Sequence, residues 1–170
     1  DYSKKYDKLI KFFEDNYPDY YNLKFNTSVI SINEIQNNLE KDEVILEYSL
    51  MDSLLFTYII TSQGHYIHEQ KIDSSFTGNT VKFYEVITNQ RFSYDVKKTF
   101  DTYTELGYEL YRVLLQPFTE FIQGKSIILI PDKQLSYIPF GALLTEEVVT
   151  DHKPNYYICP YVIKKHAISY

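Results

Sequence analysis

The most regular apolar pattern of the chain lies in EVILEYSLMDSLLFTYIITSQGHYIHEQKI, residues 43–72. Every second residue of its first part is apolar, which places one set of side chains on one face of a strand: Val44, Leu46, Tyr48 and Leu50. Residues 54–60 are apolar on both faces, which is typical of a central strand with two covered sides. The turn-like residues 62–65 lead into a third β-prone run, residues 66–72. We therefore predict three consecutive antiparallel strands.

Two helices are predicted before these strands. Residues 3–17 place apolar side chains at helical spacing with charged residues between them, and Pro18 ends that pattern. Ser31 followed by Glu34 is a capping box, in which the two side chains satisfy each other's backbone N–H at the start of a helix. The helix that it starts is expected to be short and to end near Leu39.

The longest helix is predicted after the strands. Its apolar stripe runs from Val96 to Leu114, and we expect the helical path to continue past Pro117 to Gly124. Residues 74–94 also permit a helix, with Gly78-Asn79 breaking its start. The apolar residues at helical spacing in that segment are Val81, Tyr84 and Ile87.

A buried strand is predicted at residues 126–130, an unbroken apolar run closed by Pro131-Asp132. Residues 135–144 are compact and apolar, and Phe140 within them is expected to be buried beneath the longest helix or against the central strands. Residues 156–170 offer two short β-prone stretches. The predicted fold class is α/β, with α+β as the alternative: a mixed, largely antiparallel sheet covered by helices.

Composition limits the class of protein. A chain of 170 residues can bury a core and is expected to form one domain. With 18 Tyr, 11 Phe and 44% hydrophobic residues, it does not have the composition of a disordered chain. The formal net charge of -6 disfavours nucleic acid as a partner. No apolar run approaches the ~20 residues that span a bilayer and no signal peptide is recognisable, so we expect a cytoplasmic protein without a membrane partner.

Two motifs resemble ligand sites but have plainer interpretations. Gly124-Lys125-Ser126 has the ending of a phosphate-binding loop, yet the glycine needed five residues earlier is Thr119. The tripeptide also enters a strand, so we interpret Gly124 as a helix-end glycine. His65 and His68 are three residues apart, which on a strand puts them on opposite faces, and no metal site is predicted there.

Cys159 and His166 provide the thiol and the imidazole that a cysteine nucleophile requires. However, Cys159 lies in a β-prone run, where a small buried hydrophobic residue is its usual role. Asn26-Thr27-Ser28 matches a glycosylation sequon, a pattern that is common by chance. The more prominent carboxylates form no acid-base pair by spacing: Asp42, Glu43, Glu47, Asp132, Glu146 and Glu147. We therefore assign no catalytic, cofactor-binding or metal-binding residue to this chain.

Parts of the chain resemble a known family. The strand-like residues 43–48 and 55–61 are followed later by a more specific block, IILIPDKQLSYIPFGAL, residues 127–143. Together with residues 166–170, they resemble the first half of a CHAT domain, the caspase-like domain that follows tetratricopeptide repeats in bacterial proteins. The resemblance extends from about Asn22 to the last residue.

This resemblance implies a cysteine endopeptidase of the caspase and separase clan, or a degenerate relative of one. In that family the general base is the His of a His-Gly step, and the nucleophile is the Cys of an Ala-Cys step. None of the four histidines here precedes a glycine, and Cys159 follows Ile158, so neither role can be carried onto this chain. We therefore expect the chain alone to be inactive and its parent to be the peptidase.

The resemblance also implies a domain organisation. Residues 1–21 would form an amphipathic linker helix that follows helical repeats, and residues 22–170 would form the N-terminal, caspase- and separase-like subdomain. Its partners would be the C-terminal half of the same protein, the upstream repeats and other proteins. The start at Asp1 and the strand-like end at residues 168–170 lead us to expect a piece of a longer protein. The alternative is a free-standing protein-interaction module without enzymatic activity, whose many tyrosines supply contact area.

Overall fold

The computed structural model of the chain describes four stretches: residues 2–25, 29–88, 95–149 and 153–170. The chain consists of two compact units, one that ends at Glu34 and one that begins at Ile35. The predicted division into residues 1–21 and 22–170 rests on the family resemblance and stays a prediction.

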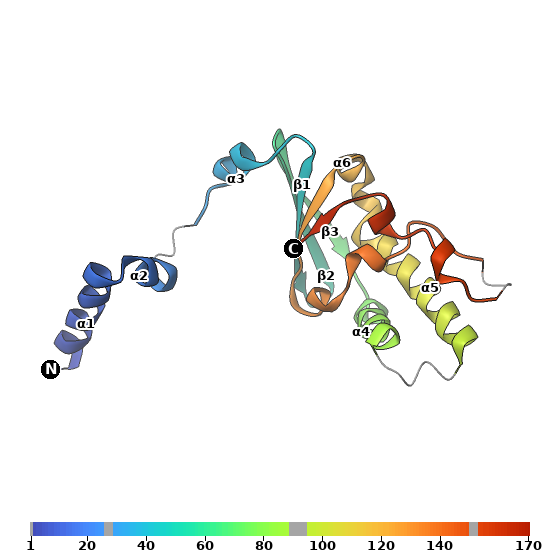
Figure 1. The fold of residues 1–170 in the computed structure, drawn as a ribbon, viewed down its shortest axis with the longest axis horizontal. Coiled ribbons are helices and arrows are strands. Elements are labelled where there is room, and N and C mark those ends of the chain that lie inside the picture. Colours follow the sequence, from blue (N-terminus) through green and yellow to red (C-terminus); the bar gives the residue numbers. More distant parts are fainter. Residues whose placement is uncertain (1, 26–28, 89–94, 150–152) are drawn as a thin grey trace. The chain divides into compact units, whose positions relative to one another are not determined.

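The first unit contains two helices, α1 (Tyr2–Asn16) and α2 (Pro18–Phe25) (Figure 1). Pro18 ends the first helix as predicted and also opens the second, because a proline at the first helical position loses no intrahelical hydrogen bond. Phe13 of α1 contacts the rings of Tyr17 and Tyr20 at centroid distances of 6.0 and 5.5 Å. An aromatic cluster therefore holds the two helices together.

The helix α3 (Ile32–Asn38) begins with the predicted capping box. The Glu34 carboxylate accepts the backbone N–H of Ser31 at 2.8 Å, and the Glu34 N–H donates to the Ser31 hydroxyl at 3.3 Å. Hydrogen bonds from the Ser31 backbone and side chain hold the pKa of Glu34 below its ordinary value. The capping-box prediction is confirmed.

The second unit is built on a five-stranded sheet with the strand order β3-β2-β1-β4-β5 (Figure 1). The strands are β1 (Glu43–Met51), β2 (Leu54–Thr61), β3 (Gly64–Lys71), β4 (Ser126–Ile130) and β5 (Ile168–Ser169). β1, β2 and β3 are consecutive antiparallel neighbours, which confirms the prediction from residues 43–72. β4 pairs with β1 and β5 with β4, both in parallel.

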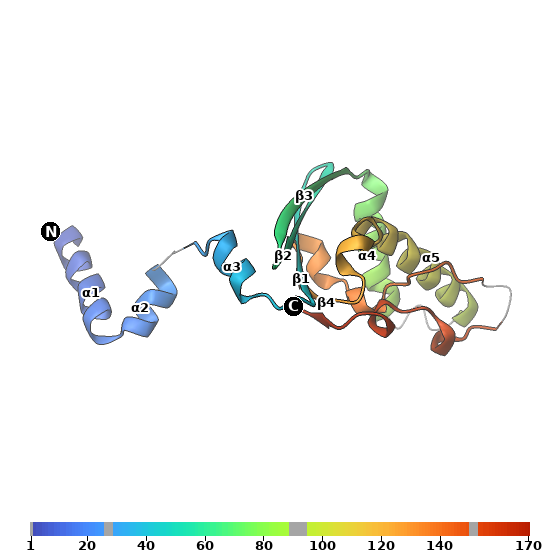
Figure 2. The same ribbon diagram turned by 90° about the horizontal axis from the view of Figure 1, so that it is seen from above.

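Two long helices, α4 (Ser74–Thr88) and α5 (Val96–Leu114), lie on the same side of this sheet (Figure 2). After α5 the path stays helical through the 3₁₀ turn Gln116–Phe118 and α6 (Thr119–Ile122), as predicted. The core lies between these helices and the alternating apolar residues of β1, which are all buried. The α/β class with a mixed, largely antiparallel sheet is confirmed.

The course of α4 corrects the prediction for residues 74–94. Gly78-Asn79 does not break the start but lies inside the helix, because the Asp73 carboxylate fixes the helix start by accepting the N–H groups of Ser75 and Phe76 at 2.9 and 3.1 Å. The predicted stripe is 42% to 48% exposed: Val81, Tyr84 and Ile87. The buried face consists of Phe76, Thr80, Phe83 and Val86. Residues 89–94 lie outside the described residues.

The segment after β4 packs on the same side of the sheet as the helices. Phe140 is fully buried and its ring contacts that of Tyr48 on β1 at 5.6 Å, so its predicted burial against the central strands is confirmed. The first of the two β-prone stretches is corrected: it forms the 3₁₀ turns Tyr156–Ile158 and Val162–Lys164. Asn155 caps the first turn by accepting the N–H of Tyr157 at 3.1 Å, which favours a turn over a strand.

Candidate protein-interaction surface

The structure places Cys159 and His166 in structural roles. Cys159 is fully buried, its Sγ lies 3.7 Å from the carbonyl oxygen of Asn155, and burial raises the pKa of the thiol. The ring of His166 contacts a different backbone oxygen, that of Lys125, at 3.3 Å. A buried thiol with a raised pKa is a poor nucleophile, because the thiolate is the reactive form. These contacts do not support a catalytic pair.

The ligand-like motifs also have structural explanations. His65 and His68 lie on opposite faces of β3, and the His68 ring packs edge-on against Phe118 at 5.3 Å. Among the described residues, no group of three or more His, Cys, Asp or Glu could hold a metal ion. Gly124 has a φ of +71° after α6, which confirms the helix-end interpretation. The sequon at residues 26–28 lies outside the described residues.

Three of the carboxylates singled out in the sequence stabilise local structure. Glu146 forms an exposed ion pair with Lys165 at 3.0 Å, and Glu43 accepts the backbone N–H of Glu40 at 3.0 Å. Asp132 accepts the backbone N–H of Leu50 at 2.9 Å. These contacts explain the three carboxylates without an active site.

The strand register divides the sheet side chains into two faces. The inner face contains the buried residues of β1 and packs against the helices. The residues that alternate with these along each strand form the opposite face. We call this opposite face the outer face; its central residues are Glu47 and the apolar Ile45, Phe56, Tyr58, Ile60, Ile67, Ile128 and Ile130. The inner face is the core, and the outer face is the candidate site.

The outer face is apolar but only partly covered. Ile67 is 63% exposed and Ile130 is 46% exposed, while Phe56 and Tyr58 are half-buried. Toward the end of β2 the face is covered: Ile60 is buried, and Gln36 of α3 donates to the carbonyl oxygen of the next residue, Thr61, at 2.8 Å. The expectation that residues 54–60 have two covered sides therefore holds for the inner face but not for the outer Phe56 and Tyr58. Exposed apolar side chains that are neighbours on a sheet face are typical of an interaction site.

The direction in which the chain winds explains why neither long connection covers this face. The chain passes from β3 to β4 and then from β4 to β5, each time to a parallel strand that lies further toward the β5 edge of the sheet. Because such crossovers are nearly always right-handed, two crossovers in the same direction place their connections on the same face of a sheet. The contacts of Tyr48 agree with this: its hydroxyl donates to the Leu114 carbonyl of the first connection at 2.6 Å, and its ring meets Phe140 of the second.

A second apolar surface lies beside β5. Its hollow of about 440 Å³ is lined in part by Pro139, Ala142, Ile163, Ile168 and Tyr170. The Tyr170 hydroxyl accepts the backbone N–H of Phe140 at 3.1 Å, which ties the end of the chain to the 139–143 segment. The side of the sheet at β5 therefore also offers apolar contact area.

Sequence reasoning missed the outer face as a site, although a signal was present. The apolar residues on both faces of 54–60 indicated that each face needs cover, but not that one face stays partly exposed. A comparison with protein-family models finds no match, and a comparison with curated proteins finds no significant relative. In the described residues, no helix has the length and apolar character needed to cross a membrane.

Proposed function

We propose that this chain is the non-catalytic, structural and regulatory half of a CHAT-like cysteine endopeptidase. In this proposal the chain packs against the protease half and connects it to the sensor repeats. The complete protein works in the cytoplasm of a bacterium. The observation that carries the proposal is the outer face of the sheet, which is apolar and half-exposed. An antiparallel sheet can leave one face in water when that face is polar, but an apolar face gains stability from a second covering layer, which would come from another part of the protein or from a partner.

The physical roles of the family-like block also support the proposal. Its Pro-Asp-x-x-Leu-x-x-Ile-Pro-Phe-x-x-Leu pattern fixes an exit from the sheet and a set of buried residues: Leu135, Ile138, Phe140 and Leu143. Asp132 of the same pattern completes the hydrogen bonds of β1. The acid and the four apolar positions of the pattern therefore have structural roles, which supports the assignment of this block to a supporting half.

The test is to follow the reading frame past Tyr170 and to assay the complete protein on a peptide library. We expect the continuation to contain His-Gly and Ala-Cys steps. Turnover should be lost when the Cys of the Ala-Cys step is replaced by Ala, and kept in the Cys159→Ala variant. The chain of residues 1–170 should give no turnover. If residues 1–170 show turnover and the Cys159→Ala substitution abolishes it, the proposal is overturned.

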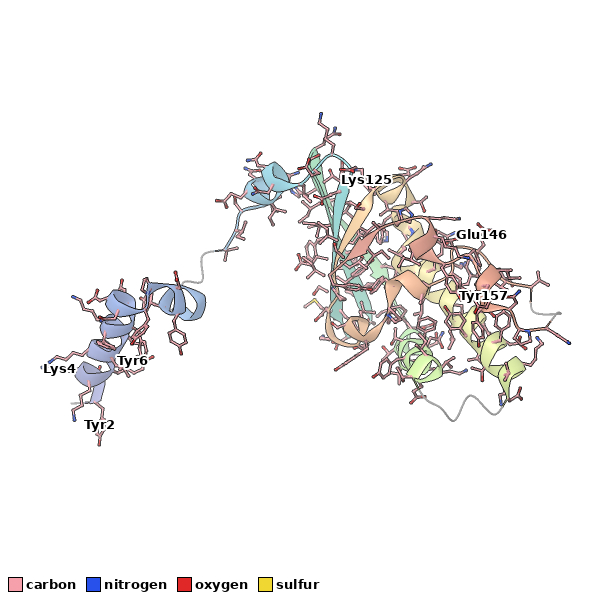
Figure 3. The ribbon with its side chains drawn as sticks, in the orientation of Figure 1. Tyr2, Lys4, Tyr6, Lys125, Glu146 and Tyr157 are labelled. Carbon is pink, nitrogen blue, oxygen red and sulfur yellow. The ribbon has the colours of Figure 1, made fainter. Side chains whose placement is uncertain are left out.

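The exposed aromatic side chains favour a second candidate function, a free-standing interaction module. Tyr2 and Tyr157 project from the surface (Figure 3), and they are 91% and 92% exposed. Tyrosine is enriched at protein interfaces because it offers a large, amphipathic contact surface with few rotatable bonds. A reading frame that ends at Tyr170 would favour this module over the protease half.

A further inference from the structure

The middle of the outer face has an acidic residue between apolar neighbours. The register aligns Ile67, Tyr58, Glu47 and Ile130 across β3, β2, β1 and β4. Ile45 and Ile128 extend the apolar surface: they are paired with each other and lie two residues before Glu47 on β1 and Ile130 on β4. Glu47 is exposed. Any layer that covers these isoleucines would also remove water from the Glu47 carboxylate, and such a charge is tolerated only with an opposite charge beside it.

This charge limits what can occupy the face. A second copy stacked by a two-fold axis would bring the central Glu47 of each copy toward the other, and the net charge of -6 on each chain would add to the repulsion. An extended peptide adds to the edge of a sheet and not to its face. In α/β architectures the element that covers a sheet face is an α-helix, which does so with one apolar stripe.

We infer that the outer face binds one amphipathic helix whose apolar stripe is interrupted by a Lys or Arg that pairs with Glu47. This inference rests on the proposed function in taking that helix from the protease half of the same protein. The cation would offset the desolvation of Glu47 and would reject helices with an acidic or wholly apolar stripe. Glu47 is thus a specificity-determining residue of the surface.

The position of the helix is tested by photo-crosslinking in the complete protein, with benzoylphenylalanine in place of Ile130. We expect a single cross-linked segment beyond residue 170, with helical spacing of its apolar residues and a Lys or Arg among them. A cross-link between two copies, or to a segment without a cation, would overturn the inference.

The charge pairing is tested by Glu47→Lys, with Glu105→Lys as the matched control, because Glu105 is also exposed but lies on α5. In the complete protein we expect Glu47→Lys to lower the melting temperature by at least about 4 °C and the control to change it by at most about 1 °C. In residues 1–170 alone, both variants should be within about 1 °C of the parent chain. Replacing the cross-linked cation by Glu should restore at least half of the loss in Glu47→Lys.

The outcomes separate the two proposals. A reading frame without a protease half would overturn both. A protease half to which Ile130 does not cross-link would overturn the inference about the helix and leave the proposed function to its own test. A cross-link to the protease half combined with equal effects of Glu47→Lys and Glu105→Lys would leave the proposed function standing and overturn the pairing of Glu47 with a cation.

Discussion

The Asp132 carboxylate accepts the backbone N–H of Leu50 at 2.9 Å, across 82 positions of the chain. The ammonium group of the next residue, Lys133, donates to the carbonyl oxygen of the same Leu50. β4 pairs with β1 only as far as Glu47 and Ile130, after which the chain leaves the sheet. Two side chains therefore replace the missing strand at the end of β1 and satisfy backbone groups that would otherwise lack a partner.

Asp132→Ala is expected to lower the free energy of unfolding by about 1 to 3 kcal/mol, because it leaves the half-buried N–H of Leu50 without its charged acceptor. Asp132→Asn is the matched control, since its amide oxygen can still accept that N–H, and it should lose less than half as much. Urea unfolding of the three proteins measures the difference. Equal losses in the two variants would show that the hydrogen bond to Leu50 contributes little.

Phe140→Ala is expected to destabilise the protein by about 3 to 5 kcal/mol, because the ring is fully buried against Tyr48 and its removal leaves a cavity. Tyr157→Ala removes an aromatic ring that is 92% exposed and should stay within about 0.5 kcal/mol of the parent. Thermal or urea unfolding distinguishes the two variants. Similar melting temperatures for both would contradict the assignment of Phe140 to the core.

Most of the fold could be predicted where a periodic pattern was strong. The alternation in residues 43–72 identified three strands and their order, and the stripe from Val96 to Leu114 identified the longest helix. The failure in α4 has a specific cause: the buried stripe includes Thr80, whose hydroxyl donates to the carbonyl oxygen of Thr77 at 2.7 Å. A polar residue in the buried face hid the correct stripe, and the three apolar residues beside it suggested the wrong one.

The 3₁₀ turns and the outer face were harder to predict, for different reasons. A turn of three residues such as Tyr156–Ile158 has no periodicity, and it depends on caps such as Asn155 and on contacts with the core. The outer face depends on topology, because only the parallel placement of β4 beside β1 and β5 beside β4 puts both connections on one side. Alternation alone shows that Glu47 and Tyr58 belong to a face, not that this face lacks cover.

Two glycines should respond to alanine in opposite directions. Gly78 lies inside α4, and nothing lies within 4 Å of a Cβ added there, so Gly78→Ala should stabilise the protein by about 0.5 to 1 kcal/mol through helix propensity. Gly124 has a φ of +71°, which an L-residue adopts only with strain, so Gly124→Ala should destabilise it by about 1 kcal/mol although space is also available. Stabilisation by both substitutions would contradict the left-handed conformation of Gly124.

Acid should weaken the cap of α4. Hydrogen bonds from the Ser75 side chain and the Phe76 backbone hold the pKa of Asp73 below its ordinary value in the folded protein. A carboxyl whose folded pKa is lowered contributes stability that is present above its unfolded pKa and is lost as the pH falls through the folded one. The stability advantage of the parent over Asp73→Asn should therefore be constant at neutral pH and shrink below about pH 4. Urea midpoints across this range measure it, and an advantage that grows on acidification would contradict the assignment.

Cys159 should behave as an inert core residue. Its side chain is fully buried and burial raises the pKa of its thiol, so both access and thiolate content are low in the folded protein. At about pH 8 we expect a disulfide reagent such as Ellman's to react at least about 100-fold more slowly with the native chain than with the chain in concentrated guanidinium chloride. The denatured sample is the control, because it exposes the same thiol without its surroundings. A native rate equal to or faster than the denatured rate would indicate an activated thiolate, and would reopen the case for Cys159 as a nucleophile.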